Sequence, residues 1–472
     1  MASSIILQSN EVSSLQQTLI QSESAEIQYI YNTREIYNPS ATSFYNITPV
    51  SGTATSGQAV SFQLPKYGFL NAVNLNFTKT IVASGLVAAA LDTDQIRVDD
   101  YSILKNIDRV EFLSSSRVLY TIYFNSDMAC MYADLTNEEK QALDYTAFKN
   151  VNSYVQGVAT ATNASATGTY NIPLHFPFLS RIDCNPMLSF QEPCQIRVVF
   201  GNLDTYKATS GAIDARVALP ATLTMSDVSL DLRFSMFNEA DTASIIQQNY
   251  GNEPSLNKLI TGRRYRENPS QILKVDGASS SITAGQEHTI TMDLRNIDCI
   301  QSWNFVVYEH KNVLKNVNGN TTHIDNLKDT FGLDGLYTPL PITSIEILAS
   351  GQSISTLGAN ALKYSRISDN GWSTLNDSNF AKNIAKSQVG YNEHDQGGVL
   401  SNSTSMRELN NVQAKITFNA NPFISVPTLI TPTTFPPDIN KATEYQAFCS
   451  EETVCIESIS SSTGRSIISL AN

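Results

Sequence analysis

The stretch Ile107–Thr121, IDRVEFLSSSRVLYT, returns in similar form as Ile342–Thr356, ITSIEILASGQSIST. The two copies start 235 residues apart (342 − 107), almost half of the 472 residues. Residues that correspond in register are Ile107 and Ile342, Val110 and Ile345, Glu111 and Glu346, Leu113 and Leu348, Leu119 and Ile354, and Thr121 and Thr356. Each copy has an apolar run, a short polar turn and a second run, which is the pattern of a β-hairpin. Because solenoid repeats span only about 20–50 residues, this repeat predicts two copies of a whole domain. The alternative is that two unrelated hairpins look alike.

The composition favours strands over charged helices. Apolar residues make up 42% of the chain and charged residues only 16%, while Tyr and Phe number 20 each. A length of 472 residues suits two large β domains or three average ones. The net charge is −13, whereas proteins that grip nucleic acid normally present a positive field. We therefore expect no direct binding of nucleic acid.

Cysteine usage and the apolar runs bear on the compartment. The six cysteines form no C-x-x-C pair, which excludes a zinc ribbon or a redox motif. Cys184 with Cys194, and Cys449 with Cys455, can each form a bridge, but buried thiols are commoner in a protein made in the cytosol. The start, MASSIILQSN, lacks the features of a signal peptide. The most apolar run, Ile81–Leu91, is too short to span a bilayer.

Short alternating segments recur through both halves of the chain. The predicted strands lie near Ala59–Leu64, Leu70–Val82, Ile107–Phe124, Tyr170–Leu179, Cys194–Phe200, Val228–Met236, Thr289–Leu294, Trp303–Tyr308, Ile342–Thr356, Val412–Phe418, Tyr445–Phe448 and Ser466–Leu470. Long polar loops are predicted at Val155–Thr169, Leu203–Thr222, His310–Leu340 and Thr374–Gly398. We predict an all-β fold: two tandem eight-stranded jelly rolls with long loops, a few short helices and an N-terminal arm.

Three segments fall outside the strand pattern. Residues 1–50 are predicted to be the arm, with Val12, Leu15 and Leu19 at helical spacing. A helix over Leu135–Asn150 begins with the capping-box pattern of Thr136 and Glu139. Residues 51–250 form the predicted first roll, and residues 251–472 a linker and the second roll. Three arginines near the boundary suggest pairing with acids of a neighbouring subunit or domain: Arg263, Arg264 and Arg266.

The search for chemistry is largely negative. No phosphate-binding loop or zinc-protease motif occurs, and Gly351–Ser355 lacks the last glycine of a nucleophile elbow. Glu111 and Glu346 occupy equal places in the two copies, so they are interpreted as strand residues pairing across a sheet rather than as a glycosidase pair. The histidines are too scattered for a metal cluster: His175, His288, His310, His323 and His394. An acidic loop with a weak calcium pattern contains Asp92, Asp94, Asp99 and Asp100. We predict no catalytic residues, no cofactor, no metal site and no enzymatic activity.

Several stretches resemble one protein family. Leu70–Ile81 followed by the first hairpin, NIPLHFPF at Asn171–Phe178, LRNIDCIQSWNFVV at Leu294–Val307, and Ser344–Ser353 are similar to segments of the double jelly-roll major capsid proteins. That family includes proteins of tailless icosahedral phages, adenoviruses and large nucleocytoplasmic DNA viruses. The resemblance covers nearly the whole chain.

The resemblance implies a structural role. In this family three chains form a trimer whose six rolls give a pseudo-hexameric capsomer, and the capsomers tile an icosahedral shell. It implies a homotrimer located in the virion and made in the host cytoplasm. The implied partners are neighbouring capsomers, penton and minor capsid proteins, and an internal membrane beneath the shell.

Two other classes remain open. A receptor- or glycan-binding β-sandwich would need exposed aromatic residues with acidic partners, and the chain has only Trp303 and Trp372 as tryptophans. Trp303 lies in a strand that is predicted to be buried. A jelly-roll glycosidase would need a close pair of carboxylates, which the pattern does not supply.

Overall fold

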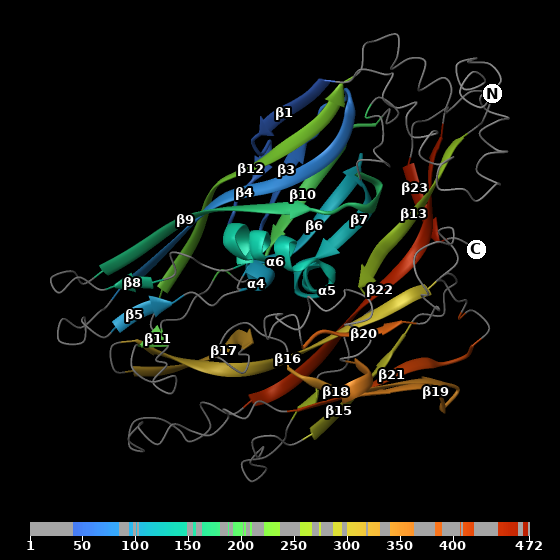
Figure 1. The fold of residues 1–472 in the computed structure, drawn as a ribbon. Helices are drawn as coiled ribbons and strands as arrows, with labels where there is room; N and C mark the ends of the chain where they lie inside the picture. Colours follow the sequence, from blue (N-terminus) through green and yellow to red (C-terminus); the bar gives the residue numbers. More distant parts are fainter. Residues whose placement is uncertain are drawn as a thin grey trace, which may run out of the picture.

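The computed structural model describes a chain of two β-sandwiches (Figure 1). The described residues are 41–84, 94–97, 101, 103–148, 154–156, 163–179, 187, 192–201, 203, 208–209, 221–236, 255–266, 273–274, 287–294, 300–317, 320–330, 340–362, 383–388, 406, 409–419, 442–460 and 466–470. No helix among them is long and apolar enough to cross a membrane.

The first sandwich is an eight-stranded jelly roll. Its strands, in chain order, are β1 (Ala41–Ile47), β3 (Ala59–Gln63), β4 (Phe69–Ser84), β6 (Ile107–Ser114), β7 (Arg117–Tyr123), β9 (Asn163–Leu174), β10 (Cys194–Phe200) and β12 (Ala221–Met236). One sheet has the order β1-β12-β4-β9 and the other the order β3-β10-β6-β7, with β2 (Ser51–Gly52) at its edge. A small sheet, β11-β5-β8, joins β5 (Asp94–Arg97), β8 (Tyr154–Gln156) and β11 (Ala208–Thr209).

The second sandwich has the same connectivity. Its eight strands are β13 (Ser255–Arg266), β15 (Glu287–Asp293), β16 (Ile300–Val317), β18 (Ile342–Ala349), β19 (Gln352–Gly358), β20 (Ala385–Gln388), β21 (Val412–Asn419) and β22 (Ala442–Ser460). One sheet runs β13-β22-β16-β20, because β20 pairs with β16, and the other runs β15-β21-β18-β19. In both rolls the first, eighth, third and sixth strands share one sheet, and the second, seventh, fourth and fifth share the other. Added strands are β14 (Leu273–Lys274), β17 (Asn320–Thr330) and β23 (Ser466–Leu470). The predicted two tandem jelly rolls are confirmed.

Alternating apolar residues build the core of each roll. Val60 and Phe62 on β3 pair in register with Val198 and Ile196 on β10, and all four side chains are buried. A strand with period-two alternation presents one face to the opposite sheet. Burial of this apolar area, at about 25 cal/mol per Å², is the main contribution to the stability of the sandwich.

The repeated hairpins are equivalent residue by residue. In the first, Glu111 pairs with Thr121 and Phe112 with Tyr120, and in the second Glu346 pairs with Thr356 and Ile347 with Ser355. The register then shifts after Phe112 and after Ile347, the same position in each copy. The bulged residues are Leu119 and Ile354. A shared bulge at one position is a stronger sign of duplication than shared strand length, because bulges are specific local features.

The turns of the two hairpins are similar but not identical. The first turn residue has a left-handed backbone in both copies, with φ of 55° at Ser115 and 51° at Ser350. In the second copy the next residue, Gly351, also has a positive φ of 79°. Two left-handed residues in succession are typical of the turn that best fits twisted strands. Only the second hairpin has the glycine that this conformation favours.

Short helices in the first roll lie before β6, after β7 and after β9. They are α4 (Ile103–Asn106), the π-helical turn η3 (Phe124–Met128), α5 (Ala129–Asp134), α6 (Asn137–Leu143), the π-helical turn η4 (Asp144–Phe148) and, after β9, the 3-10 turn η5 (Pro177–Leu179). The predicted capping box at the start of α6 is confirmed, since Thr136 and Glu139 exchange side-chain and backbone hydrogen bonds. The helix predicted to reach Asn150 is followed only to Phe148, where the described segment ends.

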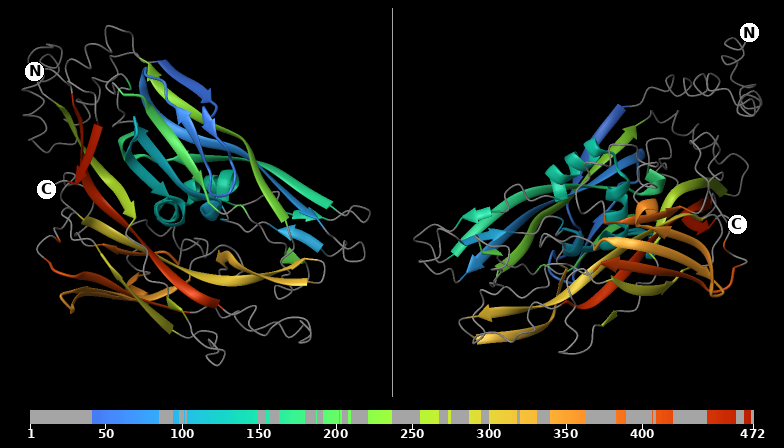
Figure 2. Two further views of the ribbon diagram at one scale, coloured as in Figure 1. Left: turned by 180° about the vertical axis from the view of Figure 1, so that it is seen from behind. Right: turned by 60° about the horizontal axis from the view of Figure 1, so that its bottom comes forward.

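The second roll packs against these helices. Val306, Tyr308 and Phe448, on the face of β16 and β22 turned away from their own sandwich, belong to the core cluster of the first roll. Trp303 and Phe305 on the other face belong to the core of the second roll. Figures 1 and 2 show β16 and β22 between the helices of the first roll and strands β15, β18 and β21. The sheet therefore has protein on both faces.

Some sequence predictions about loops were wrong. Val155–Thr169 overlaps β8 and the start of β9, and His310–Leu340 includes the end of β16 and all of β17. β20 lies within the loop predicted at Thr374–Gly398, and β11 within that at Leu203–Thr222. These strands are rich in polar residues, and the pairing with a distant strand, rather than local alternation, determines their conformation.

Two other segments differ from their predicted role. Ala41–Ile47, counted with the arm, forms β1 at the edge of a sheet, where most of its residues are exposed and leave little apolar signal. Ser255–Arg266, counted with the linker, forms β13. Residues 1–40 of the arm and the proposed boundary at residue 250 lie outside the described residues and stay predictions.

Candidate functional site

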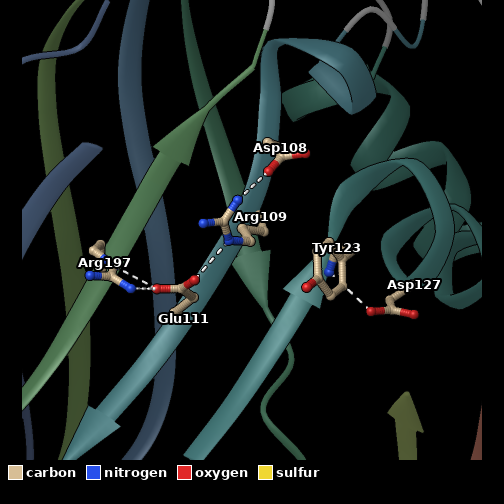
Figure 3. Close-up of polar contacts among 6 residues, drawn as sticks. All are labelled: Asp108, Arg109, Glu111, Tyr123, Asp127 and Arg197. Carbon is tan, nitrogen blue, oxygen red and sulfur yellow. Dashed lines mark hydrogen bonds and ion pairs between the residues drawn. The ribbon is translucent and has the colours of Figure 1, made fainter. Parts of the chain in front are cut away.

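A buried ion-pair cluster lies on the outer face of the sheet β3-β10-β6-β7 (Figure 3). Glu111 on β6 lies directly opposite Arg197 on β10 and forms an ion pair with it. The Arg109 Nε donates a hydrogen bond to Glu111 Oε1 at 2.7 Å, and its Nη1 donates to Asp108 Oδ2 at 2.6 Å. Glu111 is only 5% exposed, so its charge depends on these two guanidinium groups.

The neighbouring carboxylates favour the charged form of Arg109. Partial burial alone would lower the pKa of Arg109, but hydrogen bonds and the negative charges of Glu111 and Asp108 outweigh it, so the pKa is raised. A charged arginine on each side of Glu111 balances its carboxylate. The cluster therefore links β6 to β10 through an ion pair that continues along β6 to Arg109 and Asp108.

The second roll repeats the arrangement in a simpler form. Glu346 on β18 lies opposite Lys415 on β21, and the Lys415 Nζ is 3.6 Å from Glu346 Oε2. Both side chains are substantially exposed. The interpretation of both glutamates as cross-strand partners is confirmed, although Glu111 is buried rather than turned to solvent. Each carboxylate is matched to a cation in its own roll.

Trp303 does not offer a sugar-binding surface. Its indole is buried, and Nε1 donates a hydrogen bond to Glu451 Oε1 at 3.0 Å within the second roll. The strand was predicted to be buried, and this is confirmed. Trp372 lies outside the described residues.

The histidines are not brought together. His288 stacks on Tyr445, with ring centroids 5.5 Å apart, at the edge of the second core. His175 is exposed after β9, while His310 and His323 are on β16 and β17 without facing each other in register. In the described part of the chain no group of three or more His, Cys, Asp or Glu side chains is placed to hold a metal. Asp94 is on β5, and Asp92, Asp99, Asp100 and His394 lie outside the described residues.

Neither candidate disulfide forms between described cysteines. Cys449 and Cys455 are six residues apart on one strand, about 20 Å at about 3.3 Å per residue, which is beyond disulfide reach. Cys194 is a buried thiol, and burial raises the pKa of this thiol to about 12. It is therefore unreactive near neutral pH. Cys184 lies outside the described residues.

The arginines near the predicted boundary lie within the second roll. Arg263, Arg264 and Arg266 are on β13, and in the register with β22 Arg264 is opposite Glu452. Lys258 on the same strand is opposite Glu457. All three arginines therefore lie on one strand of the sheet β13-β22-β16-β20, paired with β22 of the same roll.

An exposed surface with little charge covers the sheet β1-β12-β4-β9. Asn46 Nδ2 donates to Asp231 Oδ1 at 2.7 Å, and Asn76 donates to the other oxygen of Asp231. Asn171 in turn donates to Asn76, so a polar ladder crosses all four strands. Beside it Phe44 is 72% exposed. Because most donors on this ladder are already used within the sheet, the surface is suited to contact with protein.

A second exposed apolar residue lies on the other roll. Ile354, at the bulge of β19, is 47% exposed, whereas its counterpart Leu119 on β7 is 4% exposed. β7 is contacted by β13 and β23 of the second roll. No strand in the described part of the chain covers β19 in the same way. The two equivalent edges therefore differ in whether they have a neighbour.

Solved structures with a similar fold come from viral capsids. A chain of the PBCV-1 virus capsid superposes with a TM-score of 0.57 at 13% identity, covering 92% of this chain and 98% of that one. The PBCV-1 protein VP54, in a crystal structure fitted into a reconstruction of the virophage Sputnik, gives 0.55 at 14% identity, with coverage of 92% and 98%. A Sputnik virophage structure gives 0.55 at 11%, with coverage of 92% and 89%. No family model matches the sequence, and no curated protein matches it.

Proposed function

We propose that this chain, whose fold is that of the double jelly-roll major capsid proteins, is itself the major capsid protein of a virus. The observation that carries the proposal is the internal duplication. Two rolls with one strand order and hairpins of identical register stand in a chain that superposes almost end to end on capsid subunits.

The proposed unit of assembly is a homotrimer. Three copies of a chain with two similar rolls give six similar edges, and such a capsomer can fill a hexagonal position in a lattice with only three subunits. Neighbouring capsomers, penton and minor capsid proteins and an internal membrane are the proposed partners. The protein is proposed to act in the virion after synthesis in the host cytoplasm, and no catalytic role is assigned to it.

The site geometry supports a structural role over its rivals. Glu111 and Glu346 are paired with cations in separate rolls, so they do not form the close carboxylate pair of a retaining glycosidase. Trp303 is buried and hydrogen-bonded, so it cannot stack on a sugar as a receptor- or glycan-binding sandwich would require.

The mass of the purified protein in solution tests this proposal. We expect mass photometry to show a species of three times 51.8 kDa, about 155 kDa, and negative-stain images of it to have a hexagonal outline. A protein that remains monomeric at micromolar concentration, or a trimer with a plain triangular outline and no lattice contacts, would contradict it.

A further inference from the structure

The chain contains one complete contact between rolls. The second roll uses the outer face of the sheet β13-β22-β16-β20, where Val306, Tyr308 and Phe448 are buried against the first roll. The first roll offers β7 and the helical turn η3 that follows it, and Tyr308 Oη donates to the Asn125 carbonyl of that turn at 2.7 Å. We call this contact the internal junction.

Each half of the internal junction has a second copy elsewhere in the chain. The counterpart of β7 is β19, and the residues after it, 359–362, are again helical. The counterpart of the sheet β13-β22-β16-β20 is the sheet β1-β12-β4-β9. Neither counterpart has the neighbour that its equivalent has in the described part of the chain: Ile354 is 47% exposed and Phe44 is 72% exposed.

The outer face of the sheet β1-β12-β4-β9 has features suited to contact with another protein surface. The ladder from Asn46 through Asp231 and Asn76 to Asn171 satisfies its polar groups within the sheet. The guanidinium of Arg233, the residue opposite Phe44 in register, lies 5.9 Å from the centre of the Phe44 ring. An exposed aromatic side chain beside an arginine, on a polar surface with few charges, matches the composition of interfaces between proteins.

We propose that β19 and residues 359–362 of one copy dock on the outer face of the sheet β1-β12-β4-β9 of a second copy, in the place that β7 and η3 take on the sheet β13-β22-β16-β20 within the chain. The occupant is a second copy because the two surfaces are the counterparts of the two halves of a junction that the chain already forms with itself. This inference rests on the proposed trimer and assigns its contact surfaces.

The arrangement is head-to-tail. Each chain supplies one sheet face, the head, and one strand edge, the tail, and the two surfaces are different. A heterologous contact of this kind closes into a ring when its rotation permits and otherwise extends without limit. Alternating internal junctions and contacts between copies place six rolls around one axis in a trimer.

Two single variants damage the two surfaces separately. Ile354→Asp places a charge on the tail, and Phe44→Arg places one on the head, and both sites are exposed, so neither change disturbs a core. We expect mass photometry to show monomers for each variant. Tyr145→Asp is the matched control, because Tyr145 is 75% exposed on η4, outside both the internal junction and the proposed contact, and this variant should remain trimeric.

Mixing the two variants tests the head-to-tail geometry. The intact tail of Phe44→Arg can bind the intact head of Ile354→Asp, so the mixture should give a one-to-one heterodimer of about 104 kDa, twice 51.8 kDa, in analytical ultracentrifugation. Neither variant alone should form a dimer. An interface built from one surface on both partners cannot give this complementation.

The outcomes separate this inference from the proposed function. A wild-type protein that is monomeric contradicts the trimer itself. If the wild type is a trimer and either variant stays trimeric, the assigned surfaces are wrong and another segment, such as residues 1–40, covers that face. Monomeric variants that give no heterodimer on mixing would also overturn the head-to-tail assignment. Hydrogen exchange on the wild-type trimer gives an independent check, since β1 and β19 should exchange more slowly there than in the variants.

Discussion

At the scale of single residues, the two equivalent glutamates have different environments. Glu111 is nearly buried between two arginines, and Glu346 is half-exposed beside one lysine. Removing one member of a buried pair leaves the other charges without compensation, whereas an exposed pair contributes little. Position in a repeat therefore does not determine what a residue contributes to stability.

Neutralising each glutamate measures this difference. Glu111→Gln should lower the free energy of unfolding by about 2–3 kcal/mol. This loss is at the low end for breaking a buried ion pair, because the two arginines are partly exposed. Glu346→Gln should change it by less than about 1 kcal/mol. Urea unfolding of the two variants and the wild type checks this, and equal losses would contradict it.

His288, in the second roll, makes the stability of the protein depend on pH. Burial against Tyr445 and Phe418 lowers the pKa of its imidazole, and Nε2 has no hydrogen-bond partner among the described residues. In the unfolded chain the pKa is about 6.5. The neutral form is therefore favoured in the fold, so the stabilising effect is complete above about pH 6.5 and decreases as the pH falls through the lowered value.

Replacing His288 tests whether its imidazole causes this pH dependence of stability. Urea midpoints of the wild type should fall between about pH 7.5 and about pH 5.5. His288→Phe, which keeps the aromatic contacts, should show a smaller fall over the same interval. An unchanged pH dependence in the variant would show that other groups are responsible.

At the scale of elements, the paired hairpins share a register but differ in the turn. Gly351 has a φ of 79° with no atom near the position of a Cβ, so a side chain there would strain the backbone without causing a clash. The corresponding residue, Ser116, is exposed and does not have a positive φ. A comparison of the same substitution at the two sites therefore isolates the cost of the left-handed backbone at Gly351.

Alanine at both turns gives a matched comparison. Gly351→Ala should cost about 1 kcal/mol of stability, since left-handed backbone is unfavourable for residues with a Cβ. Ser116→Ala should be within about 0.5 kcal/mol of the wild type. Differential scanning calorimetry of both variants measures the difference, and a neutral Gly351→Ala would be inconsistent with the turn described.

Elements with a local signal were predictable from the sequence, and elements without one were not. β3 and β10 alternate strictly, and Thr136 and Glu139 mark the start of α6, so these were found. In β13 the sequence SLNKLITGRRYR has no clean alternation, and its place in the sheet depends on β22, almost 200 residues later. The ion pairs of Glu111 were foreseen as a type of contact, but its burial depends on Arg197 in a strand 86 residues away, which no local pattern reveals.

At the scale of the whole molecule, the internal junction joins the two rolls into one unfolding unit. Val306, Tyr308 and Phe448 come from the second roll but lie in the core cluster of the first. Separating the rolls would expose this apolar surface and break the hydrogen bond from Tyr308 to Asn125. We therefore expect the rolls to unfold in a single transition rather than as independent domains.

Removing a side chain from the junction tests this coupling. Phe448→Ala should cost about 3–5 kcal/mol, as expected for a buried aromatic residue, and should lower the melting temperature of the single transition without splitting it. Tyr145→Ala, at a side chain 75% exposed, serves as the control with little effect. Two separate calorimetric peaks, in the wild type or the variant, would show that the rolls unfold independently.

The sheet with protein on both faces has a consequence for evolution. In an ordinary sandwich every second residue of a strand faces solvent and is replaced freely over time. Trp303 to Tyr308 has no such positions, because successive side chains alternate between two cores. Among descendants of this gene we expect substitutions in this segment to accumulate more slowly than in β3 or β10, and to occur together with changes in η3 and α5 of the facing roll.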